Sequence, residues 1–151
     1  MSEPRLKVLF LCTGNSARSQ LAEALLRQLS RGRIDVSSAG SAPQPAVHPV
    51  ARSVLEEKYG IATDDLRPKN LSVFLGQPFD FVVTVCDRAA ESCPVFPGDP
   101  ERIHWSFDDP AAVREPTAQR RAFEHVADEL VGRIRIWMSL PEIRRRMEAA
   151  S

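Results

Sequence analysis

The stretch that decides the fold is Leu-Lys-Val-Leu-Phe-Leu-Cys-Thr-Gly-Asn-Ser-Ala-Arg-Ser, residues 6–19. An apolar run ends at Cys12, and Arg18 and Ser19 stand directly before an amphipathic segment that continues to Leu29. This order predicts a strand, a tight loop and a helix. Such a loop can turn several backbone N–H groups toward one tetrahedral oxyanion, at the positive end of the helix. We call the segment from Cys12 to Arg18 the oxyanion loop.

Each end of the oxyanion loop carries a group suited to anion chemistry. The field of the helix start favours Cys12 as a thiolate, which is a nucleophile near neutral pH. Arg18 can bind two anion oxygens with its planar fork, a geometry that Lys does not match. Ser19 has two interpretations, as the N-cap of the helix or as a hydroxyl bonded to the Cys12 sulfur. A buried structural Cys is the alternative for Cys12, and the small residues before Arg18 argue against it. The predicted oxyanion-binding residues are Thr13, Gly14, Asn15, Ser16, Ala17 and Arg18.

The composition is that of an ordinary globular domain. The chain has 151 residues, 43% hydrophobic and 26% charged, which predicts one domain, 1–151, with its own core. A formal net charge of +0 provides no electrostatic footprint for nucleic acid. No apolar run reaches the roughly 18 residues of a membrane span, and the N-terminus lacks a signal-peptide pattern, so we expect a cytoplasmic protein. In a reducing compartment, the three cysteines indicate chemistry rather than a disulfide framework.

Strand-like and helix-like segments alternate along the chain. The strand patterns cover residues 7–11, 34–37, 81–85 and 103–107, and the helical patterns cover residues 19–30, 49–59 and 117–138, with a further short helix from Pro141. This alternation predicts a single-domain α/β fold with a central, mostly parallel four-stranded sheet and helices on both faces. Ligands in such folds bind at the carboxyl ends of the strands. Cys12, Cys86 and the loop after Phe107 all follow predicted strands, so we expect them to converge.

Cys86 and Cys93 form a second cluster of interest. A metal site is a weak interpretation, because their spacing is unlike a zinc knuckle and only His104 is near in sequence as a further ligand. If residues 87–92 are helical, the two Cα atoms lie roughly 10 Å apart, whereas a disulfide needs them within about 7 Å. Pro94 ends any such helix. A Cys86–Cys93 bond therefore requires the segment to bend or unwind, which is typical of a redox switch.

Two adjacent carboxylates follow the last predicted strand. Asp109, whose backbone is held by Pro110, is a candidate general acid for a leaving oxygen. Taken locally, an N-cap or turn role before Pro110 is equally consistent with the sequence. The upstream Cys-x5-Arg loop favours the acid role. His48 and His104 are interpreted as structural rather than catalytic.

These motifs resemble the low-molecular-weight protein tyrosine phosphatase superfamily and, within it, the thioredoxin-coupled arsenate reductases. The resemblance extends from Lys7 to about Trp137, and its landmarks are Cys12–Ser19, Ser37-Ser38-Ala39-Gly40, Val85-Cys86, Cys93-Pro94, His104-Trp105 and Asp109-Pro110-Ala111. The Cys-x5-Arg loop is common to all these phosphatases, whereas the Cys86/Cys93 pair with Asp-Pro-Ala-Ala distinguishes the reductases. Tyrosine phosphatases of this fold tend to carry aromatic residues where Ala111 and Ala112 stand here.

The resemblance implies a relay of thiols that reduces arsenate to arsenite. Cys12 attacks arsenic while Arg18 and the loop amides hold the oxyanion, and Asp109 protonates the departing oxygen. Cys86 then attacks Cys12, and Cys93 attacks Cys86 in turn. Thioredoxin is the expected reductant of the last disulfide, with glutaredoxin or mycothiol as alternatives. We expect phosphate and sulfate to compete for the loop, and the protein to act as a monomer.

The chain departs from the family pattern at two places. Many relatives have a second Cys in the loop where this chain has Ala17, and the mechanism does not need it. Some reductases bind potassium beside the loop, through positions that match Asn15, Glu23, Ser38 and an acidic residue. That acidic position falls at or near Lys69, whose ammonium could take the place of the cation. The resemblance therefore leaves a potassium requirement in doubt.

Two other functions remain open. A phosphatase that acts on phosphotyrosine or a small phosphate ester, through a Cys12 phosphocysteine, fits the loop equally well, because phosphate and arsenate are nearly isosteric. An arsenite or metal sensor built on three thiolates accounts for the cysteines and leaves Arg18 and Asp109 without a role. The Cys86/Cys93 pair and the missing aromatic residues favour the reductase.

Overall fold

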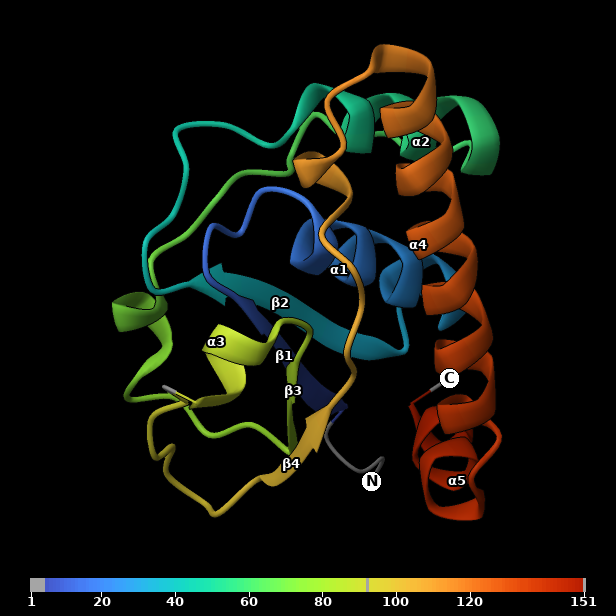
Figure 1. Ribbon diagram of the computed structural model, residues 1–151. Helices are drawn as coiled ribbons and strands as arrows, with labels where there is room; N and C mark the ends of the chain where they lie inside the picture. Colours follow the sequence, from blue (N-terminus) through green and yellow to red (C-terminus); the bar gives the residue numbers. More distant parts are fainter. Residues whose placement is uncertain (1–4, 92, 151) are drawn as a thin grey trace.

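The computed structural model describes residues 5–91 and 93–150 (Figure 1). Within these residues, four parallel strands form one sheet in the order β2-β1-β3-β4. The strands are β1 (Leu6–Cys12), β2 (Ile34–Gly40), β3 (Phe81–Thr84) and β4 (Glu101–His104). The central strands β1 and β3 are almost wholly buried, as the apolar runs that predicted them require. The predicted parallel four-stranded sheet is confirmed.

Helices connect and cover these strands. They are α1 (Arg18–Leu29), α2 (Pro49–Tyr59), α3 (Asp87–Glu91), α4 (Pro116–Met138) and α5 (Pro141–Ala149), with 3-10 turns η1 (Leu71–Phe74) and η2 (Pro110–Ala112). The long helix α4 packs against α1 and α2, and α5 folds back beside its C-terminal end (Figure 1). In the described part of the chain, no helix combines the length and the apolar character needed to cross a membrane.

Helices cover both faces of the sheet. On one face, the ring of Phe81 in β3 meets that of Trp137 in α4, with centroids 5.3 Å apart. Phe81 pairs with Val8 of β1, so the side chains of Phe81 and Val8 point to the same face of the sheet. Leu11 of β1 lies an odd number of residues after Val8, so the Leu11 side chain points to the opposite face. There, Leu11 lines a small cavity with Ala89 of α3. Helix α3 therefore lies directly beside the strand that ends at Cys12.

The last strand differs from its predicted range, 103–107. β4 pairs with β3, and β3 ends at Thr84 because the chain then turns into α3. The last residue of β4 with a partner in β3 is therefore His104. Trp105 and Phe107 are only 7% exposed although they lie in an irregular segment. The apolar residues that predicted a strand at this position belong to a loop that is packed into the core. The segment that leads to Asp109 is therefore anchored by two buried aromatic rings.

Candidate active site

The backbone carbonyl groups of residues 13–16 in the oxyanion loop accept hydrogen bonds from residues outside the loop. Backbone N–H groups of the segment after β2 donate to three of them, from Ala42 to Thr13 (3.0 Å), from Gln44 to Gly14 (2.9 Å) and from His48 to Ser16 (2.9 Å). The side chain of Gln20 donates to Asn15 O at 3.0 Å. In a trans peptide, a C=O and the N–H that follows it point in opposite directions. The amides of residues 14–17 therefore point into the loop, where an oxyanion can accept them.

Asn15 fixes the shape of this loop. Its φ of 47° lies in the left-handed region, which Asn adopts more readily than most residues. The buried side chain is held by three hydrogen bonds. Its Nδ2 donates to Ser19 Oγ at 2.8 Å and to Ser38 Oγ at 2.9 Å, and its Oδ1 accepts from the Lys69 backbone N–H at 2.8 Å. Neighbours from α1, β2 and the segment before η1 therefore hold the turn in place.

Gly40, the last residue of β2, allows the loop to lie close to the sheet. A Cβ atom at this position would lie 2.3 Å from Thr13 O and 2.8 Å from Cys12 O. Both are backbone atoms, so they cannot turn away as a flexible side chain could. Any larger residue would push the start of the oxyanion loop away from β2.

The structure corrects the N-cap interpretation of Ser19. Helix α1 begins at Arg18 with Ala17 at its N-cap, so Ser19 lies inside the first turn and caps nothing. Its buried hydroxyl accepts from Asn15, and between described residues the structure has no hydrogen bond from it to the Cys12 sulfur. Ser19 therefore acts on the loop through Asn15.

Arg18 and Asp109 lie together at the mouth of the oxyanion loop. Arg18 Nη1 donates to Phe107 O at 2.9 Å, and its Nη2 lies 4.0 Å from Asp109 Oδ2. Asp109 Oδ1 accepts from the Ala111 N–H at 3.0 Å, so one carboxylate oxygen caps η2 while the other faces Arg18. The buried Arg18 Nε has no partner within residues 5–91 and 93–150. A bound oxyanion would provide the missing acceptor.

These groups line one cavity of about 750 Å³, which contains Cys12 and the whole oxyanion loop. Among the lining residues that the sequence did not predict, Gln44 and Arg88 carry polar or charged side chains. Gln44 belongs to the segment after β2 and Arg88 to α3, and no motif marks either position. The cavity is larger than a tetrahedral oxyanion requires, so it leaves space for water or for a substituent on the anion.

Both histidines that the sequence analysis interpreted as structural have structural partners. His48 caps α2 through its Nδ1, and its ring lies 4.7 Å from that of Phe123. Burial lowers the pKa of His48, which keeps the ring neutral near pH 7. His104 lies between Thr84 Oγ1, at 2.8 Å from its Nδ1, and Asp87 Oδ1, at 3.0 Å from its Nε2. It therefore joins β3, β4 and the start of α3.

The three cysteines surround α3, and all three are free thiols. Cys12 and Cys86 are buried, Thr13 Oγ1 lies 3.6 Å from Cys86 Sγ, and the pKa of each of the two thiols depends on the other. Cys93 is half-buried and lines the same small cavity as Cys12. A helix, α3, separates Cys86 from Cys93 in the reduced chain, which is the case that the sequence analysis considered for a Cys86–Cys93 switch. The last residue of the predicted helical segment, Ser92, lies outside the described residues.

The two thiols shift each other's pKa in opposite directions. Hydrogen bonding from the Cys12 thiol to the Cys86 thiolate lowers the pKa of Cys86. The same bond raises the pKa of Cys12, and burial adds to that rise, whereas the charge of Arg18 opposes it. The two thiols therefore titrate as one coupled pair, in which the first proton is lost more readily than the second. This corrects the expectation that Cys12 alone has a lowered pKa, because the sequence does not reveal the second thiol in contact with it.

The positions considered for potassium form a buried ion-pair network. The Glu23 side chain is 5% exposed, and its Oε1 accepts from Ser38 Oγ at 2.8 Å. Lys69 Nζ lies 3.5 Å from the same oxygen, and Arg27 lies 3.0 Å from Oε2. The ammonium of Lys69 thus supplies positive charge beside the residues that hold Asn15. Across residues 5–91 and 93–150, no three His, Cys, Asp or Glu side chains gather as metal ligands.

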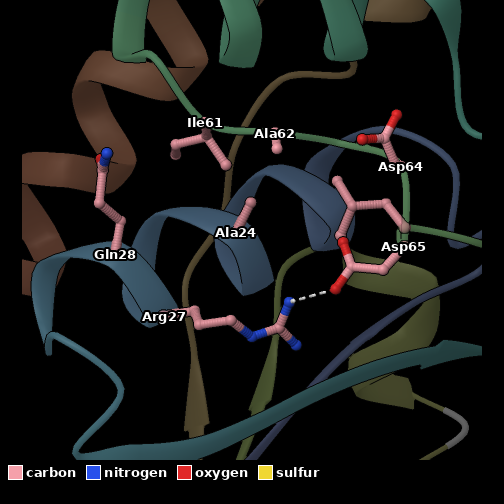
Figure 2. A pocket seen from close by; sticks show the side chains of 8 residues that line it. Ala24, Arg27, Gln28, Ile61, Ala62, Asp64 and Asp65 are labelled. Carbon is pink, nitrogen blue, oxygen red and sulfur yellow. Dashed lines mark ion pairs between the residues drawn. The ribbon is translucent and has the colours of Figure 1, made fainter.

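A second pocket, of about 420 Å³, opens between α1 and the segment after α2 (Figure 2). Arg27 reaches toward Asp65 there, with 3.9 Å between Nη1 and Oδ2, and Ala24 and Ile61 contribute apolar surface. None of the predicted catalytic or oxyanion-binding residues lines it. This pocket is therefore separate from the candidate active site.

Known proteins share this fold. Residues 7–149 match the family model of low molecular weight phosphotyrosine protein phosphatase. An arsenate reductase of Halalkalibacterium halodurans is 40% identical over 129 residues, which cover 85% of this chain and 91% of that protein. A thioredoxin-dependent arsenate reductase of Corynebacterium glutamicum has a TM-score of 0.71 and 28% identity, covering 100% of this chain and 66% of that one. An arsenate reductase in its phosphate-binding state has a TM-score of 0.71 and 25% identity, covering 89% and 97%. The chain belongs to the low molecular weight phosphotyrosine protein phosphatase family and, within it, is similar to the arsenate reductases.

Proposed function

We propose that this chain reduces arsenate to arsenite through the thiols of Cys12, Cys86 and Cys93. The observation that carries the proposal is the placement of two buried thiols at the carboxyl ends of the central strands: Cys12 ends β1, and Cys86 follows β3 with its Sγ 3.6 Å from Thr13 Oγ1 in the oxyanion loop. Ester hydrolysis in such a loop needs one thiol. A relay needs a second sulfur close enough to attack the first. The similarity to arsenate reductases supports the same reaction.

In the first step, the loop amides and Arg18 hold arsenate above Cys12. The proton that the thiol pair shares passes to Cys86, which leaves a Cys12 thiolate beside Arg18. This thiolate forms a bond to arsenic, and the departing hydroxide takes a proton from Asp109 and leaves as water. Arsenic remains As(V) in this step.

In the second step, Cys86 releases that proton to water, and the resulting Cys86 thiolate attacks Cys12 Sγ. The new S–S bond forms as the S–As bond breaks, and the electron pair of the broken bond stays on arsenic. As(V) thereby becomes As(III), and two thiol sulfurs are oxidised to one disulfide. Thr13 Oγ1, at 3.6 Å from Cys86 Sγ, supports the attacking thiolate.

In the third step, the Cys93 thiolate attacks Cys86, and Cys12 leaves as a thiolate. Helix α3 separates Cys86 from Cys93 in the reduced chain, so the new bond requires α3 to bend or unwind. Thioredoxin, or another dithiol, then reduces the Cys86–Cys93 disulfide and returns the chain to its starting state.

A second candidate function is hydrolysis of phosphate monoesters through a Cys12 phosphocysteine. The volume of the cavity, about 750 Å³, supports it because an ester substituent would fit. Ala111 lines that cavity and offers no aromatic surface for a phosphotyrosine ring. This reaction uses Cys12, Arg18 and Asp109 and needs neither other thiol.

Anaerobic incubation of the fully reduced chain with arsenate tests the proposed reduction. We expect one arsenite per protein molecule and the loss of two of the three thiols, because As(V) takes up two electrons. Arsenite is measured by speciation of the released arsenic, and thiols are counted by titration in denaturant. Phosphate in place of arsenate is the control and should leave every thiol free. Unchanged thiols and no arsenite after arsenate treatment would contradict the proposal.

A further inference from the structure

Cys93 lies beside a cavity that the chemistry above does not use. The cavity has a volume of about 150 Å³ and opens between α3 and the edge strand β4. Cys93 and Ala90 line it from the side of α3, and Arg102 and His104 line it from β4. Arg102 has no role in the three steps described so far, although it shares this cavity with the resolving thiol.

Arg102 is bound to the backbone next to Cys93. Its Nη2 donates to Pro94 O at 3.0 Å. The Cys93 thiol donates to the same oxygen, with 3.7 Å between Sγ and O. One carbonyl group therefore joins the thiol to the guanidinium. When the thiol loses its proton, the negative sulfur stays close to a positive charge that does not titrate.

The other surroundings of Cys93 do not favour a thiolate. Burial raises the pKa of Cys93, and the charge of Arg102 opposes that rise. In the two cavities that Cys93 lines, the other titratable groups of described residues are His104 and Cys12. The ring of His104 is held between Thr84 and Asp87. Arg102 is therefore the permanent cation of this site.

We propose that Arg102 is a positioning residue for the resolving thiol: it holds the Pro94 peptide and supplies the cation beside which the Cys93 thiolate forms. The inference rests on the proposed relay. In the resolving step, the Cys93 proton passes to water through the open cavity, and Cys93 Sγ forms a bond to Cys86 Sγ. The Cys12–Cys86 bond breaks, and Cys12 leaves with the electron pair. The exchange replaces one disulfide by another, so it needs no further oxidant.

A protein with a single thiol tests the action of Arg102 on Cys93 without arsenate. The Cys12→Ser/Cys86→Ser double variant retains only Cys93, and its alkylation by iodoacetamide is followed across pH. Adding Arg102→Gln should raise the pH midpoint and slow alkylation near pH 7 about tenfold, as expected for a pKa rise of about one unit. Arg102→Lys, which keeps the charge, should restore most of the rate.

The same substitutions in the chain with all three cysteines test the resolving step. In a single turnover, Arg102→Gln should slow conversion of the Cys12–Cys86 disulfide into Cys86–Cys93 about tenfold, in proportion to the smaller thiolate fraction. Arsenite release should keep its rate, because it precedes this step. Arg102→Lys is the matched control.

Two results would overturn the inference. One is an unchanged Cys93 alkylation midpoint in Arg102→Gln. The other is that Arg102→Gln slows arsenite release and disulfide transfer equally and that Arg102→Lys restores neither rate. That result would mean that Arg102 has only a structural role. If the unsubstituted chain forms no Cys86–Cys93 bond, the relay itself is wrong. In that case the alkylation midpoints alone decide whether Arg102 acts on Cys93.

Discussion

The Cys12→Ser variant is expected to lose arsenate reduction and phosphate ester hydrolysis together, each by about 10⁴-fold or more. Both reactions begin with attack by the Cys12 sulfur, and a Ser hydroxyl remains protonated where a thiol ionises. The side chain is only 7% exposed, and the substitution changes a single atom, so the fold should persist. Arsenite release and hydrolysis of an aryl phosphate are measured on the same preparation.

Phosphate binding provides the control for the Cys12→Ser variant. The loop amides and Arg18 remain in place, so calorimetry should still detect phosphate in the loop. Cys93→Ser is the matched variant and should keep its ester hydrolysis. Substantial ester hydrolysis by Cys12→Ser would show that another group is the nucleophile.

The Cys86→Ser variant is expected to separate the two reactions. Repeated arsenate turnover should fall about 10³-fold or more, because no sulfur remains in contact with Cys12 to release arsenite. Hydrolysis of an aryl phosphate should persist, because phosphoryl transfer to water needs only Cys12, Arg18 and Asp109. Equal loss of both activities would mean that Cys86 is structural, and the phosphatase interpretation would gain support.

The pH profile of Cys86→Ser carries a second expected result. In the unsubstituted chain, the hydrogen bond with Cys86 raises the pKa of Cys12. Its loss should lower that pKa, because the charge of Arg18 still stabilises the thiolate. A larger thiolate fraction then exists at lower pH, so the acidic limb of ester hydrolysis should shift to lower pH. A shift to higher pH would contradict the assignment of the shared proton.

Local patterns in the sequence were sufficient to predict most of the fold. The apolar run before Cys12 and the small residues up to Arg18 are neighbours in the chain, so the strand, the loop and the helix start are local consequences of them. The helical pattern of residues 117–138 predicted α4 in the same way. The predicted end of the last strand was wrong, because Trp105 and Phe107 are buried without belonging to it.

The parts of the active site that could not be predicted depend on contacts between distant residues. The thiol of Cys86 lies near Cys12 at the carboxyl ends of the central strands β1 and β3, and its influence raises the pKa of Cys12, contrary to the expectation for Cys12 alone. The N-cap interpretation of Ser19 was wrong, because the helix begins at Arg18 with Ala17 as its N-cap, and the Ser19 hydroxyl accepts from the buried Asn15 instead. Arg88 enters the cavity only because α3 folds beside the oxyanion loop. Such contacts follow from the tertiary fold and leave no local signal in the sequence.

Peptide mapping of the Cys93→Ser variant after anaerobic treatment with arsenate tests the thiol relay most directly. Cys93 is proposed only to resolve the Cys12–Cys86 disulfide, so its loss should stop the cycle after one arsenite per molecule. The map should then contain a peptide pair joined through Cys12 and Cys86. Continued turnover at the rate of the unsubstituted chain, with thioredoxin as the sole reductant and no Cys12–Cys86 peptide, would contradict the relay.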